Sequence, residues 1–263
     1  MNMPSASGVV GRVYVGLVLF FLYAPILVMA LMSFNASEFY QLPFHFTLEW
    51  YRRLSGNEQI LRAAARSLWI AVATTIFATT IGTMAAIALF RYEFPGKRVL
   101  QAMLFPPIAI PWLITGTSML VFFFWVGIGR GTPAVILGHV ALALPYVIVV
   151  VAARLETFDI QLEEAARSLG ASPWRVTWAV TLPWIASGVV AGALFAFAVS
   201  FDQFVVSYFL AQPGDATLPV VIYTSIRKGF TPEINAISTI IIVISMAVML
   251  EASRRFRFGG EQR

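Results

Sequence analysis

The sequence contains no cysteine, and this absence excludes a disulfide framework, a thiolate metal site and a catalytic thiol. Histidine is scarce too, and its two copies, His45 and His139, fall in segments that we expect at different depths of a membrane. No HExxH motif is present. We therefore expect this chain to hold no metal ion.

Motifs for nucleotide and hydrolytic chemistry are also missing. The chain lacks the GxxxxGK[ST] loop that cradles nucleotide phosphates, so we do not expect it to bind ATP in the usual way. Ser172, in the segment GASPW, does not stand in a nucleophile-elbow pattern. The sequence therefore predicts no enzymatic activity and no cofactor bound by this chain, and any energy must come from a partner.

Charged side chains are rare. Only 12% of the 263 residues are charged and 59% are hydrophobic, against about a quarter and about half in soluble proteins. The net charge of +5 is small for this length, and membrane topology explains it better than nucleic acid does. These proportions predict an all-α integral membrane protein that contacts lipid and no nucleic acid.

Long uncharged runs predict six membrane spans in a single transmembrane domain over residues 1–263. The first run, residues 13–32, would form a helix of about 30 Å, which matches a bilayer core. It is too long for the core of a signal peptide, so we expect it to be retained as a span. The expected spans cover about 13–32, 67–90, 99–126, 134–153, 184–201 and 234–250.

The positive charges predict the orientation of these spans. With both termini inside, 11 Lys and Arg residues fall on the inner side and 7 on the outer side. Because cytoplasmic loops carry an excess of Lys and Arg, this bias favours two cytoplasmic termini. It also makes residues 154–183 a cytoplasmic loop.

Individual residues refine three of these segments. Pro106, Pro107 and Pro111 interrupt the third span near its start, and such breaks are tolerated where protein or a cavity satisfies the freed carbonyls. We therefore expect this span to face the protein interior. In the second span, small residues such as Gly82 would let neighbouring helices approach closely. Before it, the aromatic and basic residues around Trp50 predict a helix lying at the outer membrane interface.

Residues 163–183 form the most polar long segment between two apolar runs, and local rules predict a helix, a turn and a second helix. The first helix should begin near residues 159–160. It carries Glu163 and Glu164 early and Arg167 late, the order that a helix dipole favours, and Gly170 follows as a left-handed stop.

Ser172 and Pro173 suit the N-cap and first helical positions, so the second helix should begin at Trp174 and run toward Pro183. Ala165 and Ala166 leave a shallow apolar face on the first helix that another protein could approach closely. So many polar residues between two spans indicate a docking site.

This segment resembles the cytoplasmic EAA loop of binding-protein-dependent ABC importer permeases. Glu164, Ala165 and Ala166 are followed by Gly170, and then by Val180 to Pro183 at the family's spacing, with Val180 where the family usually has Ile. The alternative is an ordinary amphipathic loop helix with a chance triplet.

In that family the loop is a coupling helix that sits in a cleft of the ATPase subunit. The resemblance implies a type I ABC importer permease fold in which Glu164 makes a polar contact with the ATPase, the two alanines allow close packing and Gly170 permits the turn. The implied coupling residues are Glu163, Glu164, Ala165, Ala166, Arg167, Gly170, Leu182 and Pro183.

A second resemblance narrows the solute. Residues 200–239 are similar to the C-terminal part of the smaller permease subunit of spermidine/putrescine importers. The likeness implies inward transport of polyamines, or of a related small cation, across a bacterial inner membrane. It also implies as partners an ATPase dimer that binds ATP and Mg²⁺, a second and different permease, and a periplasmic or surface solute-binding protein.

Candidate solute contacts are few. Asp202 ends the fifth apolar run, where a carboxylate is costly unless it faces water or a partner, so it could meet a cation or simply lie at the outer interface. His139 could contact solute, although a hydrogen bond between helices is the favoured interpretation. Tyr208 completes the set of candidate pathway residues.

Other functions remain open at this point. The same import machinery could carry an opine, an amino-acid derivative or ferric iron. A stand-alone secondary transporter would need its own coupling-ion site, for which only Asp202 offers itself. An intramembrane enzyme would need a nucleophile and a base at matching depth, and the sequence shows no such pair.

Overall fold

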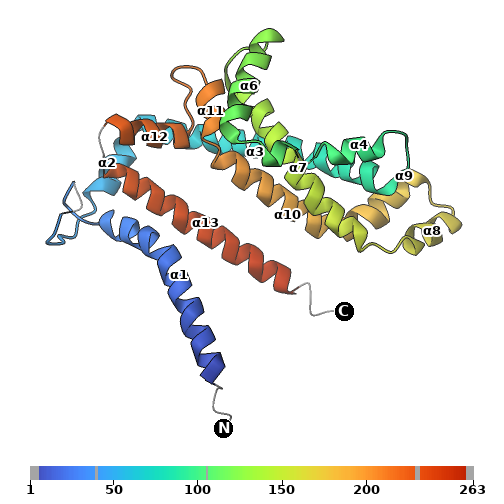
Figure 1. Cartoon of the computed structure of the whole chain (residues 1–263), viewed down its shortest axis with the longest axis horizontal. Coiled ribbons are helices and arrows are strands. Elements are labelled where there is room, and N and C mark those ends of the chain that lie inside the picture. Colours follow the sequence, from blue (N-terminus) through green and yellow to red (C-terminus); the bar gives the residue numbers. More distant parts are fainter. Residues whose placement is uncertain (1–5, 39–40, 105, 229–231, 259–263) are drawn as a thin grey trace. The chain divides into compact units, whose positions relative to one another are not determined.

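The computed structural model describes residues 6–38, 41–104, 106–228 and 232–258. These residues are helical apart from turns and one isolated β-bridge between Asn35 and Phe46 (Figure 1). The helices are α1 (Ala6–Met32), α2 (Glu49–Gly56), α3 (Glu58–Arg91), α4 (Lys97–Ala102), α5 (Pro106–Ala109), α6 (Trp112–Trp125), α7 (Thr132–Glu156), α8 (Gln161–Ser168), α9 (Pro173–Val176), the π-helical η1 (Thr177–Thr181), α10 (Leu182–Phe201), α11 (Val205–Leu210), α12 (Leu218–Lys228) and α13 (Glu233–Phe258).

The chain divides into two compact units. One comprises residues 1–61 and 222–263, and the other comprises residues 62–221. The single domain expected over 1–263 stays a prediction, as does the cytoplasmic location of the termini, whose residues 1–5 and 259–263 lie outside the described part. All the sites discussed below lie within the second unit.

The helices fit a chain that crosses a membrane several times. Four of them are long and apolar enough to span, a sharply bent helix pair supplies a fifth candidate, and a shorter apolar helix corresponds to the expected sixth span. The four are Val10–Met32, Glu58–Arg91, Thr132–Glu156 and Pro173–Phe201, the bent pair is Lys97–Ala109 with Trp112–Trp125, and the shorter helix is Glu233–Ala247. The six-span prediction is compatible with this set.

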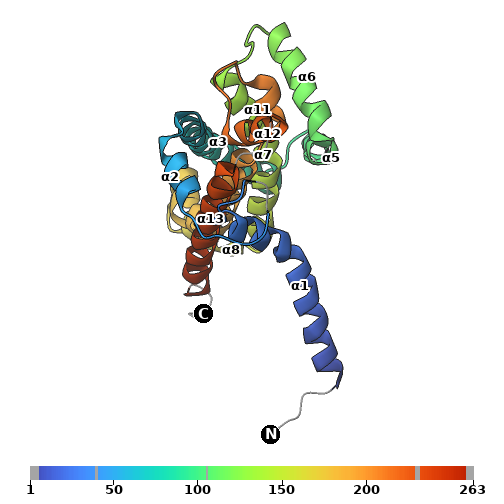
Figure 2. The ribbon, with the colours of Figure 1, turned by 90° about the vertical axis from the view of Figure 1, so that its left-hand side faces the viewer.

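The third predicted span is broken, as its prolines indicate. Pro106 begins α5, and Pro111 takes an extended conformation with ψ 130° just before α6. Proline lacks an N–H and disfavours helix in the residue before it, so the path bends by 111° (Figure 2). The expectation that this span faces the interior fails within this chain. Of α6 only Gly116 and Phe123 are buried, because α7 and α11 cover a single side of it.

The core of the second unit lies between α3, α7 and α10, and α7 and α10 run side by side (Figure 1). Val147 of α7 is fully buried between Gly82 of α3 and Gly192 of α10. A Cβ at Gly192 would lie 3.2 Å from Cγ1 of Val147. The small residues predicted to allow close helix packing therefore do so.

Helix α2 is present where an interfacial helix was expected, but Trp50 is not at the surface. Its side chain is buried, and Nε1 donates a hydrogen bond to the carbonyl of Asn35 at 2.7 Å. Asn35 is buried as well, and its Oδ1 accepts a bond from the backbone N–H of His45. The indole anchors a folded loop because a buried N–H needs an acceptor.

Candidate functional site

The polar loop after α7 forms the predicted first helix and turn. Oδ1 of Asp159 accepts a hydrogen bond at 2.9 Å from the backbone N–H of Gln161, the first residue of α8. At its end Gly170 has φ +83°, and its N–H bonds to the carbonyl of Arg167. The N–H of Ala171 bonds to the carbonyl of Ala166, which completes a Schellman motif. The left-handed stop at Gly170 is confirmed.

The second helix begins as predicted but does not stop at Pro183. Oγ of Ser172 accepts a bond from the N–H of Arg175 at 3.4 Å, and Pro173 is the first residue of α9. The helical path then continues through η1 into α10, where the N–H of Leu182 bonds to the carbonyl of Thr177. Proline clashes with the carbonyl four residues before it, and a π-helical turn relaxes that spacing. The loop is therefore continuous with the span ending at Phe201.

Glu163 is the buried centre of this loop. Its Oε1 accepts hydrogen bonds from Nη2 of Arg91 at 2.5 Å and from Oγ1 of Thr181 at 2.7 Å. Its Oε2 accepts a bond from Nη2 of Arg167 at 3.1 Å. Burial raises the pKa of Glu163, but the hydrogen bonds from Thr181 and Arg91 and the two positive charges outweigh it and hold the pKa below its usual value. The carboxylate is therefore ionised and held by three elements.

Aromatic rings support the cations around this carboxylate. The guanidinium of Arg91 lies 4.5 Å from the ring centroid of Phe158, and that ring meets Trp184 edge-on at 5.8 Å. Arg154 of α7 lies 5.9 Å from the ring of Trp184 on α10. Stacking on the ring of Phe158 stabilises the guanidinium of Arg91, whose side chain is only 15% exposed. The end of α3 is thus packed against the start of the loop.

The opposite face of the loop is open. Glu164 and Ala165 are exposed, and Leu169 is 90% exposed beside the turn. Trp174 and Trp178, whose rings pack edge to face at 5.6 Å, are also exposed. Exposed aromatic and apolar side chains that surround a helix face of small residues are typical of a protein interface.

The predicted coupling residues therefore divide between two faces. Glu163 is buried and points inward, whereas Ala166 and Leu182 are half-buried. The exposed residues are Glu164, Ala165, Arg167, Gly170 and, on α10, Pro183. Sequence reasoning missed Arg91, Thr181 and the pair Trp174 and Trp178. Arg91 gave no local signal. Thr181 lies in the segment Val180 to Pro183 that matches the family pattern but was given no role there, and two tryptophans at helical spacing could have been noticed.

The candidate pathway residues do not share one exposed surface. His139 is buried, and its ring nitrogens lie 2.8 Å from Oγ of Ser200 and 3.0 Å from Oγ of Ser207. It therefore links α7, α10 and α11, as the hydrogen-bonding interpretation expects. Asp202, at the end of α10, and Tyr208, on α11, are both exposed.

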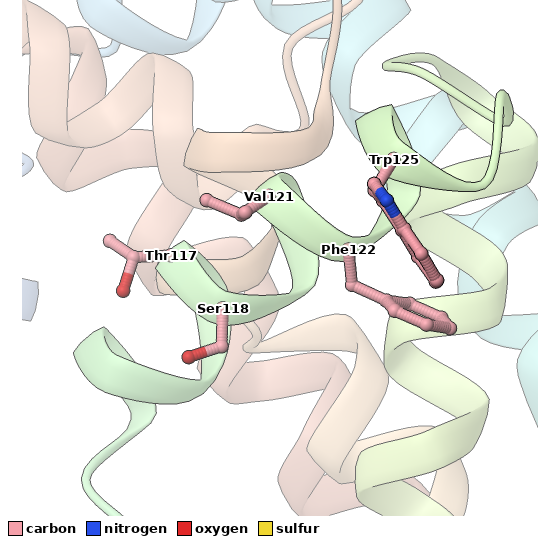
Figure 3. Close-up of a pocket in the computed structure, with 5 residues that line it drawn as sticks. All are labelled: Thr117, Ser118, Val121, Phe122 and Trp125. Atoms are coloured by element: carbon pink, nitrogen blue, oxygen red, sulfur yellow. The ribbon is translucent and has the colours of Figure 1, made fainter.

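A shallow hollow of about 480 Å³ lies along α6 (Figure 3). The rings of Phe122 and Trp125 project beside each other, while the hydroxyls of Thr117 and Ser118 lie toward the other end. Val121 completes the lining. None of the residues that the sequence singled out lines this hollow.

Comparison with known proteins gives a family and a fold. The family described as "Binding-protein-dependent transport system inner membrane component" matches residues 78–255. The spermidine/putrescine transport system permease protein PotC of Escherichia coli (strain K12) is 39% identical over 230 residues, which cover 88% of this chain and 87% of PotC. The putrescine transport system permease protein PotI of the same strain is 37% identical over 229 residues, covering 84% of this chain and 82% of PotI.

A solved structure supports the fold. A chain from a bacterial ABC transporter involved in the import of the acidic polysaccharide alginate superposes with a TM-score of 0.75 and 15% identity. The match covers 97% of this chain and 99% of that chain. At this identity the likeness shows a shared fold, that of ABC importer permeases, and says nothing of the solute.

Proposed function

Because this chain belongs to the family of binding-protein-dependent transport system inner membrane components, we propose that it is one permease subunit of an ABC importer for polyamines such as spermidine and putrescine. Members of this family are membrane components of transport systems and not enzymes. The observation that carries the proposal is the two-faced loop at α8 and α9, anchored inside by Glu163 and open outside around Leu169.

The ATPase partner docks on the open face of this loop. Ala165 allows close approach, Glu164 offers a carboxylate, and Leu169 and Trp174 supply apolar area. ATP and Mg²⁺ bind to that partner, since this chain has no phosphate loop. Closure of the ATPase dimer moves α8, and the continuous helical path from Pro173 to Phe201 carries the motion into a span. The spans then reorient to give alternating access.

The solute side of the proposal rests on likeness to PotC and PotI and on the charge of Asp202. A polyamine is a flexible cation, and an exposed carboxylate at the end of α10 can meet it as it enters. Tyr208 is exposed nearby in sequence and can add a ring face. A solute-binding protein delivers the polyamine on the outer side, and a second, different permease completes the pathway. Both termini then lie in the cytoplasm.

Purification from native membranes tests this proposal. The tagged chain, extracted in mild detergent, should bring with it an ABC ATPase and a second permease, identified by mass spectrometry. Vesicles carrying the complex should take up spermidine or putrescine with ATP. A chain that purifies alone in several detergents would contradict the proposal, and an intact complex that carries another solute would retain the class and reject polyamines.

A matched pair of variants tests the docking face. Leu169→Asp places a charge on a side chain that is 90% exposed, so the protein should insert normally but lose the ATPase during purification. Leu42→Asp is the control, because Leu42 is 75% exposed far from the loop in the sequence and should leave the ATPase bound. If Leu169→Asp keeps the ATPase, the docking face lies elsewhere.

A further inference from the structure

Glu163 and Glu164 are neighbours in sequence but have different surroundings. Successive residues of an α-helix point about 100° apart, so one carboxylate of the pair can face a partner while the other faces the chain. Glu164 is exposed, whereas the side chain of Glu163 is only 10% exposed. A residue this buried has little surface to offer an ATPase, so its part in coupling must be sought inside the chain.

The partners of Glu163 come from parts of the chain that α8 would have to move. Arg91 is the last residue of α3, and Thr181 is the last residue of η1, directly before α10. Both donate to the same oxygen, Oε1. Charge-assisted hydrogen bonds in a buried setting are short and strong, so a displacement of α8 pulls on both helices or breaks the bonds.

We infer that Glu163 is a positioning residue that passes the movement of α8 to α3 through Arg91 and to α10 through Thr181, and that it is not a contact with the ATPase. The inference rests on the proposed function, because it assigns a route for the motion that the ATPase imposes on the loop. Two spans then respond to a single docking helix. Arg167, the third partner, is 52% exposed and lies on α8 itself, so it holds the carboxylate without carrying motion between elements.

The test measures uptake per ATP hydrolysed, a ratio that would not change if Glu163 only stabilised the fold. The full complex, in proteoliposomes with its solute-binding protein, is assayed for spermidine uptake per ATP hydrolysed. In Thr181→Val, which removes one hydrogen bond and keeps the shape of the side chain, and in Glu163→Gln this ratio should fall by about fivefold or more, the lower end of typical coupling between sites. The amount of ATPase bound should stay at the wild-type level.

Two further variants make the test specific. Arg53→Gln breaks an exposed ion pair with Glu49 on α2, outside the loop, and should leave uptake per ATP unchanged. Exchange of the buried pair, Glu163→Arg with Arg91→Glu, should recover part of the ratio that Arg91→Glu alone loses. Recovery is expected because the exchange restores an ion pair between the same two helices.

The outcomes separate the inference from the proposed function. If assembled Glu163→Gln and Thr181→Val complexes keep the wild-type uptake per ATP, the inference is wrong. It is also wrong if these variants reduce the amount of assembled complex while the complexes that do assemble keep the wild-type uptake per ATP. Loss of the bound ATPase in Glu163→Gln without loss in stability would make Glu163 a docking contact and also overturn it. A wild-type chain that binds no ATPase would instead reject the proposed function.

Discussion

A methyl group added to Gly82 on α3 would lie 2.7 Å from Cγ1 of Val147 on α7. Real side chains do not approach so closely, so α3 and α7 can pack against each other at Gly82 and Val147 only because Gly82 has no side chain. Val147 is fully buried and also contacts Gly192, so it cannot turn aside without disturbing α10. The spacing of the core helices is therefore set by glycine.

Gly82→Ala should lower the stability of the protein by about 1–3 kcal/mol through overpacking. Thermal unfolding in detergent measures this, and adding Val147→Ala should recover part of the loss because the clashing methyl groups are removed. Gly16→Ala on α1 is the control, since a Cβ there meets nothing within 4 Å. Equal melting temperatures for Gly82→Ala and Gly16→Ala would contradict this account of the core.

Gly170 disfavours substitution for a different reason, which is its backbone conformation. With φ +83° and open space around a Cβ, a substitution there is strained without any clash. Gly170→Asp should leave the protein inserted, because the turn is exposed, but should distort the docking loop and reduce uptake strongly. Gly170→Asn should be milder, since asparagine tolerates this conformation better than most residues. Membrane content and uptake measured side by side check this, and normal uptake with Gly170→Asp would exclude a coupling role for the turn.

The sequence predicted what depends on near neighbours. Asp159, Ser172 and Gly170 define the loop helices through bonds to residues at most five positions away, and these ends were found. The apolar runs were found because membrane spans are read from composition. Pairings across the chain were not accessible in this way. Arg91 and Glu163 are 72 positions apart, and nothing local marks them as partners.

Two expectations failed because a residue type was taken to have only one role. The loop helix and the fifth span were predicted as separate elements on either side of Pro183, yet the π-helical turn before this proline lets the helix continue. Trp50 was assigned to the membrane interface, yet its indole N–H binds the carbonyl of Asn35 inside the protein. In both cases tertiary structure supplied an alternative that a local rule does not contain.

Asp202 and His139 should respond differently to substitution. Asp202 is exposed, so Asp202→Asn should preserve assembly and impair uptake of a polyamine, whose charge the carboxylate would attract. His139→Leu should instead destabilise the protein by about 1–3 kcal/mol, because it leaves the hydroxyls of Ser200 and Ser207 without their partner. Apparent affinity for spermidine in uptake assays, compared with melting temperature, separates the two. Unchanged uptake in Asp202→Asn would assign the carboxylate to the outer interface.

Lowering the pH should destabilise the loop by protonating Glu163. Hydrogen bonds and the charges of Arg91 and Arg167 hold the pKa of this buried carboxyl below its usual value, even though burial opposes them. A group whose pKa is lower in the folded state binds fewer protons there than in the unfolded state, so stability rises with pH. The contribution of Glu163 is therefore complete above the ordinary glutamate pKa and is lost as the pH falls through its lower folded value.

Unfolding of the detergent-solubilised protein, followed from neutral pH down to below the ordinary glutamate pKa, measures this contribution. Wild type should lose stability relative to Glu163→Gln as the pH falls, because the glutamine variant lacks the ionised group at every pH. At neutral pH the glutamine variant should be the less stable of the two, since it leaves Arg91 buried beside a neutral partner. Parallel pH profiles for the two proteins would mean that Glu163 titrates alike in the folded and unfolded states, and that its three partners do not act on its charge.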